Sequence, residues 1–241
     1  MSEENGTRIN KFIADSGLAS RRKADELIAN GLITINDRIA VNGDRIFPDD
    51  KVCYGKKVLT REEKNILLLF NKPKGIVCTA AEEEENNIVK YINYPERIYP
   101  IGRLDKDSHG LILMTNRGNF FNDIVKARYR HEKEYVVKLT RPYDEKFLRQ
   151  MSRGVYLEEL GKKTRPCMVK PVSEKSFNII LTEGLNREIR RMCEALGYRV
   201  ADLCRIRIMN LRLDGIKEGE YRDITESEKN ELEKQIGKKL W

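Results

Sequence analysis

The sequence contains few of the residues that build metal or disulfide sites. Its 241 residues include five cysteines and two histidines, and no two cysteines form a C-x-x-C pair. An odd number of scattered cysteines supports neither a disulfide framework nor a zinc site, and two histidines offer too few metal ligands. We therefore expect no bound metal.

Long apolar runs are also missing. The longest, at residues 66–70, has the length of a strand, whereas a membrane helix needs roughly 20 apolar residues. The sequence opens Met-Ser-Glu-Glu-Asn, without an apolar signal segment, and it has neither a Walker loop nor a G-x-G-x-x-G stretch. These features favour a cytoplasmic protein without a nucleotide cofactor.

Basic residues outnumber acidic ones and give a net charge of +8. A basic surface favours polyanions, because each neutralised phosphate releases condensed counterions. Residues 186–212 hold seven arginines, no lysine and only three acidic residues. Guanidinium groups bind phosphate in bidentate fashion, which favours nucleic acid as the partner, although an ordinary solvated surface is an open alternative.

The first 54 residues predict a small unit of two helices followed by short strands. Apolar positions at helical spacing are followed by a Ser16-Gly17 stop, and Ser20 and Asn30-Gly31 provide the two ends of a second helix. Alternating strands follow around a turn at Asn36-Asp37. The buried helix positions that we expect are Ile9, Phe12, Ile13, Ala24, Leu27 and Ile28.

Three cations, Arg21, Arg22 and Lys23, crowd the first turn of the second expected helix, where the helix dipole disfavours positive charge. They form either a tolerated surface cluster or a phosphate-binding face. The stretch from Arg8 to Asn36 resembles the S4 domain, a module that binds structured RNA. By that resemblance, the RNA-facing residues would be Lys11, Arg21, Arg22 and Lys23.

Residues 55–64 are polar and read as a linker to a larger domain at 65–241. Strand and helix patterns there do not alternate strictly, which predicts an α+β fold with a mixed, largely antiparallel sheet and flanking helices. We expect strands at 66–70, 134–139, 168–172 and 177–181, and helices at 119–126, 143–151, 186–196 and 226–239.

The segment at 99–111 carries the clearest chemical signal. Asp105 and Asp107 lie between Gly102 and Gly110, with cationic neighbours in the sequence. A carboxylate beside cations stays ionised at neutral pH, as a nucleophile or general base requires. The alternative is that both aspartates serve turns and caps, a common role of Asp.

Four segments in order resemble the signatures of the RsuA/RluA-type pseudouridine synthases. They are Asn71-Lys-Pro-Lys-Gly75, Gly102-Arg-Leu-Asp-Lys-Asp-Ser-His-Gly-Leu111, His131-Glu-Lys-Glu-Tyr135 and Gly184-Leu-Asn-Arg-Glu-Ile-Arg-Arg-Met192. With the S4 stretch, the resemblance spans nearly the whole chain. Asp107-Ser108-His109, Asn86-Asn-Ile-Val and Arg207-Ile-Met-Asn are most similar to the RluF branch of the RsuA/RluB/RluE/RluF type.

The resemblance assigns roles to five residues. Asp105 would be the catalytic aspartate, and Arg190 would pair with its carboxylate. Tyr135 would stack on the target uracil, Ile189 would close the apolar side of the base pocket, and Arg103 would enter the RNA stem as the uridine leaves it. Asp107 has no comparable role and is interpreted as structural.

The same resemblance implies an isomerase that acts without a cofactor, with 23S ribosomal RNA as its partner. No apolar seam stands out in the sequence, so we expect a monomer. An RsuA-like enzyme of 16S RNA, a transfer RNA enzyme and a non-catalytic S4 RNA-binding protein are the alternatives. A hydrolase of the N-glycosidic bond is another, but such enzymes usually need a second carboxylate as acid. Spacing alone gives Asp107 no such role.

Overall fold

The computed structural model describes residues 6–241 except 62–63, 82, 119, 121–122 and 125–129. These residues form two compact units. The first comprises residues up to 65 with 94–97 and 116–118, and the second comprises the remainder. Within the described ranges, no helix combines the length and apolar character needed to cross a bilayer.

The first unit begins with two helices, as the sequence predicts. Helix α1 covers Ile9–Asp15 and helix α2 covers Arg21–Ala29. The Ser20 side chain accepts a hydrogen bond from the Lys23 backbone N–H, and Asn30 ends α2. Buried apolar side chains from both helices join the strands in one core. The helix-helix-strand order is confirmed.

The strands of the first unit are short. They are β1 (Thr7–Arg8), β2 (Ile33–Ile35), β3 (Arg38–Ile39), β4 (Arg45–Ile46), β5 (Val52–Tyr54) and β6 (Lys57–Val58). Strands β3, β2, β5 and β6 form one sheet, and β1 pairs with β4. Strand β6 lies in the segment expected to be linker: Gly55, at φ +57°, turns the chain back, and Leu59 is buried in the core.

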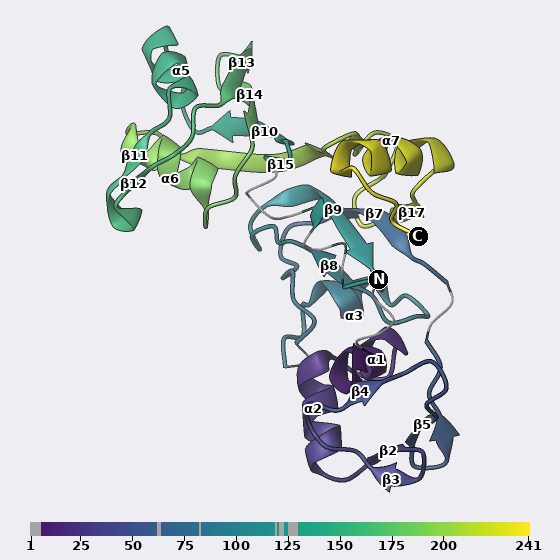
Figure 1. Cartoon of the computed structure of the whole chain (residues 1–241). Coiled ribbons are helices and arrows are strands. Elements are labelled where there is room, and N and C mark those ends of the chain that lie inside the picture. The colour runs from purple at the N-terminus through teal and green to yellow at the C-terminus, as the bar shows by residue number, and fades with distance from the viewer. Residues whose placement is uncertain (1–5, 62–63, 82, 119, 121–122, 125–129) are drawn as a thin grey trace. The chain divides into compact units, whose positions relative to one another are not determined.

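The second unit is built on a nine-stranded mixed sheet (Figure 1). Its order is β13-β14-β10-β15-β9-β7-β17, with β8 on β9 and β16 on β15. Only β15 and β9 pair in parallel among these described strands. The bounds are β7 (Leu67–Lys72), β8 (Tyr99–Ile101), β9 (His109–Thr115), β10 (Lys133–Leu139), β13 (Met168–Ser173), β14 (Ser176–Leu181), β15 (Val200–Ile208), β16 (Leu211–Arg212) and β17 (Tyr221–Asp223).

Helices flank this sheet, which completes the predicted α+β class. They are α3 (Ile88–Ile92), α5 (Glu145–Ser152), α6 (Glu188–Ala195) and α7 (Glu226–Ile236), and a hairpin of β11 (Tyr156–Leu157) and β12 (Lys162–Lys163) encloses the 3₁₀ helix η2 (Glu158–Leu160). Strands at 67–72, 133–139, 168–173 and 176–181 and helices α5, α6 and α7 match the expected elements within a few residues. The helix expected at 119–126 falls largely outside the described residues.

Two apolar cores lie on the sheet, one in each half. The first contains Leu69, Leu113 and Leu232 from β7, β9 and α7, and the second contains Phe147, Phe177 and Met192 from α5, β14 and α6. Figure 1 shows β15 running from the half beside α6 to the half covered by α7. The sheet therefore joins two separately packed halves through this strand.

The parallel contact between β9 and β15 depends on Gly110. It pairs with Arg205 and has φ +102°, a conformation that residues with a Cβ rarely adopt. A Cβ at this position would press into the backbone of Arg205 and lie 2.9 Å from the Cys204 sulfur. Only glycine lets the two strands approach this closely.

We expect Gly110→Ala to destabilise the second unit by about 2–5 kcal/mol, because it combines backbone strain with overpacking against rigid backbone. Urea unfolding followed by circular dichroism measures the effect. Gly215→Ala is the matched control: φ is +78°, and a Cβ there would meet no atom within 4 Å. It should cost only about 1 kcal/mol. Equal losses in the two variants would show that the contact with β15 is unimportant.

Candidate active site

The loop between β8 and β9 presents two carboxylates. It is held by its own backbone, since the Ser108 N–H donates to the Asp105 carbonyl at 3.0 Å. A second backbone hydrogen bond joins the loop to the 71–75 segment, since the Gly75 N–H donates to the Lys106 carbonyl at 2.8 Å. The Asp105 side chain is 32% exposed and the Asp107 side chain 51% exposed. Both carboxylates are therefore accessible from solvent.

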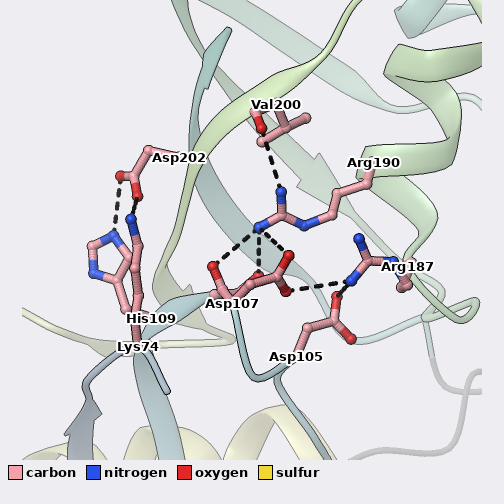
Figure 2. A network of polar contacts seen from close by, with 9 residues as sticks. Lys74, Asp105, Asp107, His109, Arg187, Arg190, Val200 and Asp202 are labelled. Carbon is pink, nitrogen blue, oxygen red and sulfur yellow. Dashed lines mark hydrogen bonds and ion pairs between the residues drawn. The ribbon is translucent and has the colours of Figure 1, made fainter. Parts of the chain in front are cut away.

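Two arginines at the start of α6 face this loop (Figure 2). Arg187 precedes the helix in a left-handed conformation, at φ +53°. Its Nη1 lies 3.3 Å from Asp107 Oδ1 and 3.8 Å from Asp105 Oδ2. Arg190, one turn later, is almost fully buried and directs Nη2 to the Asp107 carbonyl at 3.1 Å, to Asp107 Oδ2 at 3.4 Å and to Ser108 Oγ at 3.2 Å.

The pairing differs from the one that the sequence led us to expect. Arg190 contacts Asp107 rather than Asp105, and Arg187 is the cation beside Asp105. Arg187 directly precedes the helix in a left-handed conformation, and Arg190, inside the helix, reaches the following part of the loop. Asp107, interpreted as structural, lies at the centre of the ion pairs and orients both guanidinium groups.

A second charged cluster extends the loop on its other side (Figure 2). Asp202 on β15 accepts contacts from Lys74 and from His109 Nε2, the latter at 3.0 Å. Burial tends to raise the pKa of Asp202, but the hydrogen bonds from Lys74 and His109 outweigh it and hold this pKa below its usual range. The cluster ties the 71–75 segment to the end of the loop.

Arg205 is a buried residue on β15 that was not predicted as a site residue from the sequence. Its Nε donates to the Leu111 carbonyl at 2.6 Å and its Nη1 to the Arg103 carbonyl at 3.4 Å, so one guanidinium clamps the chain on both sides of Asp105. Its Nη2 is buried and finds no acceptor among the described residues. The high arginine content of residues 186–212 indicated this region, but it did not distinguish Arg205 from the other arginines there.

Lys72 is a second cation behind the loop and is fully buried. Its Nζ donates to the carbonyls of Pro73 and Ile76 at 2.8 and 2.9 Å. Burial lowers the pKa of Lys72, while Cys78, Asp105 and Asp107 act in the opposite direction. Lys72 therefore places a buried positive charge behind the aspartate loop.

The chain matches two family models. The RNA pseudouridylate synthase model matches residues 66–195, and the S4 domain model matches residues 7–52. The dual-specificity RNA pseudouridine synthase RluF of Escherichia coli K12 is 46% identical over 98% of this chain and 81% of its own length.

Two further relatives agree. The ribosomal large subunit pseudouridine synthase B of Bacillus subtilis is 38% identical over 93% of this chain and 95% of its own length. A crystal structure of a pseudouridylate synthase superimposes with a TM-score of 0.69 at 30% identity, covering 94% of this chain and all of that one. The chain belongs to the RNA pseudouridylate synthase family. It is an isomerase that converts uridine in RNA to pseudouridine.

The synthase places its expected base-pocket residues on one apolar cluster. Tyr135 is half-buried on β10 and packs against the cluster that contains Ile189, which is 4% exposed. Tyr135 is also the register partner of Arg205, whose guanidinium carbon lies 6.0 Å from the centre of the tyrosine ring. Arg205 therefore contacts both Tyr135 and the backbone of the aspartate loop.

The other expected RNA-binding residues lie at the surface of their units. Arg103 is exposed beside Asp105 in the synthase unit, and Arg21 and Arg22 are exposed in the S4 unit. Lys11 and Lys23 form ion pairs within their helices, with Asp15 and Glu26 respectively, each at 2.7 Å. The Lys23–Glu26 pair is exposed, and exposed pairs are worth little in water, whereas Asp15 is largely buried.

We expect Arg205→Lys to lower the single-turnover rate of pseudouridine formation by about 100-fold, with RNA affinity changed less than about threefold. A lysine keeps the charge, but its single ammonium cannot bridge the two carbonyls that flank Asp105. Arg207→Lys is the matched control on the same strand, since Arg207 pairs with Glu132 and Glu134 instead. Rapid-quench kinetics measures the rate, and filter binding measures RNA affinity. If both variants lowered the rate equally, or if Arg205→Lys weakened only RNA affinity, Arg205 would not be the residue that holds the aspartate loop.

Proposed function

We propose that Asp105 is the group that starts the isomerisation. The reaction breaks the N1–C1′ bond of a uridine, turns the base, and joins C5 to C1′. Two cations, Arg187 and the buried Lys72, place positive charge around Asp105. Its side chain is 32% exposed and is accessible from solvent. This accessible carboxylate in a cationic frame is the observation that carries the proposal.

Three routes fit such a carboxylate. Asp105 can attack C1′, attack C6, or act as a base toward a glycal intermediate. In each route the product is an isomer of the substrate, so no electron or group is gained or lost. The chemistry therefore requires no redox or group-transfer cofactor.

The target base must first leave the RNA stack, at a cost of a few kcal/mol. We propose that Tyr135 stacks on the flipped uracil, that Ile189 closes its apolar side, and that Arg103 fills the space left in the stem. Base–aromatic stacking contributes about 1–3 kcal/mol and offsets part of the cost. The residues proposed to hold the surrounding RNA are Lys11, Arg21, Arg22 and Lys23.

We further propose 23S ribosomal RNA as the substrate, acted on in the cytoplasm by a monomer. The Bacillus subtilis relative, named for the large subunit, is 38% identical, whereas a small-subunit synthase of Haemophilus influenzae is 31% identical. The Escherichia coli relative at 46% is named for dual specificity, which favours a second RNA class as the alternative.

Asp105→Asn should abolish isomerisation, with a loss of at least about 10³-fold, and leave RNA affinity within a few-fold. An amide cannot act as nucleophile or base but keeps the size of the carboxylate. Tritium release from [5-³H]uridine-labelled RNA measures the rate.

Asp107→Asn is the matched control. We expect a smaller loss of about tenfold, because Arg190 keeps its contacts with the 107 carbonyl and Ser108. Normal turnover by Asp105→Asn would refute the assignment, and free uracil among the products would identify a hydrolase instead.

Deleting the gene should remove pseudouridine from a specific position in 23S RNA, and the purified enzyme should restore it in RNA from the deletion strain. Pseudouridine mapping of 23S, 16S and transfer RNA measures all three substrates in one experiment. Loss confined to 16S or transfer RNA would refute the 23S proposal without affecting the assignment of Asp105.

A further inference from the structure

Two glutamates lie buried under the turn that carries the site arginines. Glu183 follows β14, and Glu188 is the first residue of α6. Each is only 4% exposed. Glu188 lies between Arg187 and Arg190 in the sequence, so whatever fixes its side chain also fixes the start of the helix.

Glu183 has more polar partners than Glu188. Its Oε1 accepts the Arg165 backbone N–H at 2.5 Å. Its Oε2 lies 3.6 Å from Lys162 Nζ and 3.9 Å from Arg165 Nε. Glu183 thus has an amide donor and two cations as partners.

Glu188 has one satisfied oxygen. Its Oε2 accepts the Leu185 N–H at 2.9 Å, which closes the turn 185–188. Its Oε1 is buried and faces no donor among the described residues. The titratable groups that interact with this carboxyl group are Glu183, Lys133 on β10 and Cys167 just before β13.

We propose that Glu188 is a neutral carboxylic acid that donates its proton to Glu183, and that this shared proton positions the arginine-bearing turn against the aspartate loop. Two neighbouring carboxyl groups that are both out of water disfavour a second negative charge. A proton on the otherwise unpartnered Oε1 gives it a hydrogen-bond acceptor and removes the repulsion. Glu188 is thereby a positioning residue, since it acts through Arg187 and Arg190.

The electrostatics agree with this geometry. Burial raises the pKa of Glu188 to about 7, and Glu183 contributes in the same direction, against the Leu185 amide and Lys133. Burial also lowers the pKa of Lys133 to about 8. Because the pKa of Glu188 is raised on folding, the stabilisation is complete at acidic pH and is lost as the pH rises through about 7.

Ionisation of Glu188 would therefore place a second charge beside Glu183 and loosen the turn. Arg187 would lose its fixed distance to Asp105, and Arg190 its contacts with Asp107 and Ser108. The inference rests on the proposed role of Asp105, because it concerns the frame around that carboxylate. It predicts an alkaline loss of rate that originates outside the reacting groups.

The test compares single-turnover rates of wild type, Glu188→Gln and Glu188→Ala from about pH 6 to about pH 8.5. Glutamine mimics the neutral acid, so Glu188→Gln should match wild type within about twofold at the acidic end. At the alkaline end it should exceed wild type by about tenfold or more, because it has no proton to lose. Glu188→Ala should be slower than both at acidic pH. Glu194→Gln, an exposed carboxylate of the same helix, is the matched control and should follow wild type throughout.

Infrared difference spectra between the same two pH values provide a readout independent of activity. Wild type should show the carbonyl band of a protonated carboxylic acid that disappears at alkaline pH, and Glu188→Gln should lack that band. A constant rate ratio between Glu188→Gln and wild type, or no such band in wild type, would overturn the proposal. A Glu188→Gln variant that is slow at every pH would also overturn it, since that result indicates an ionised Glu188 paired with Lys133. Absence of pseudouridine formation in wild type would instead contradict the family's activity.

Discussion

The site depends on ion pairs that join two segments far apart in the sequence. Arg187 and Arg190 begin α6 in one half of the sheet, and the aspartate loop precedes β9 in the other half. Each half has its own apolar core, so hydrophobic packing alone does not fix one against the other. The guanidinium contacts with Asp107 and Ser108 define where the helix start stands relative to Asp105. Charge-assisted hydrogen bonds suit this task because they are directional.

Strand β15 supplies the second connection between the halves. It pairs with β10, which carries Tyr135, and with β9, which follows the loop. Arg205 on this strand contacts both, through the tyrosine ring and through the carbonyls that flank the loop. Gly110 allows the approach that these contacts need. Tyr135, proposed to stack on the base, and Asp105, proposed to react, are thus both positioned by one backbone segment, which reduces their freedom to shift independently.

Local patterns predicted the local structure well. Ser20 was expected to cap α2 and does so, because a cap depends on residues three positions apart. The strand expected at residues 134–139 is β10. The pairing of Arg190 was not predictable in this way. Sequence spacing shows neither the left-handed conformation of Arg187 nor the position of the distant loop that the two arginines face. Arg205 was missed because its partners are backbone carbonyls, which leave no trace in residue type.

The two aspartates have different environments. Asp107 receives Arg190 and Arg187 through its carboxylate and Arg190 again through its carbonyl. Among the described residues, Asp105 has one ion pair, with Arg187 at 3.8 Å, beyond hydrogen-bonding distance. A carboxylate held by Arg190 in a tight pair would have to break that pair to reach a nucleotide. In the role proposed for Asp105, the pairing of Arg190 with Asp107 therefore leaves the oxygens of Asp105 accessible to the substrate.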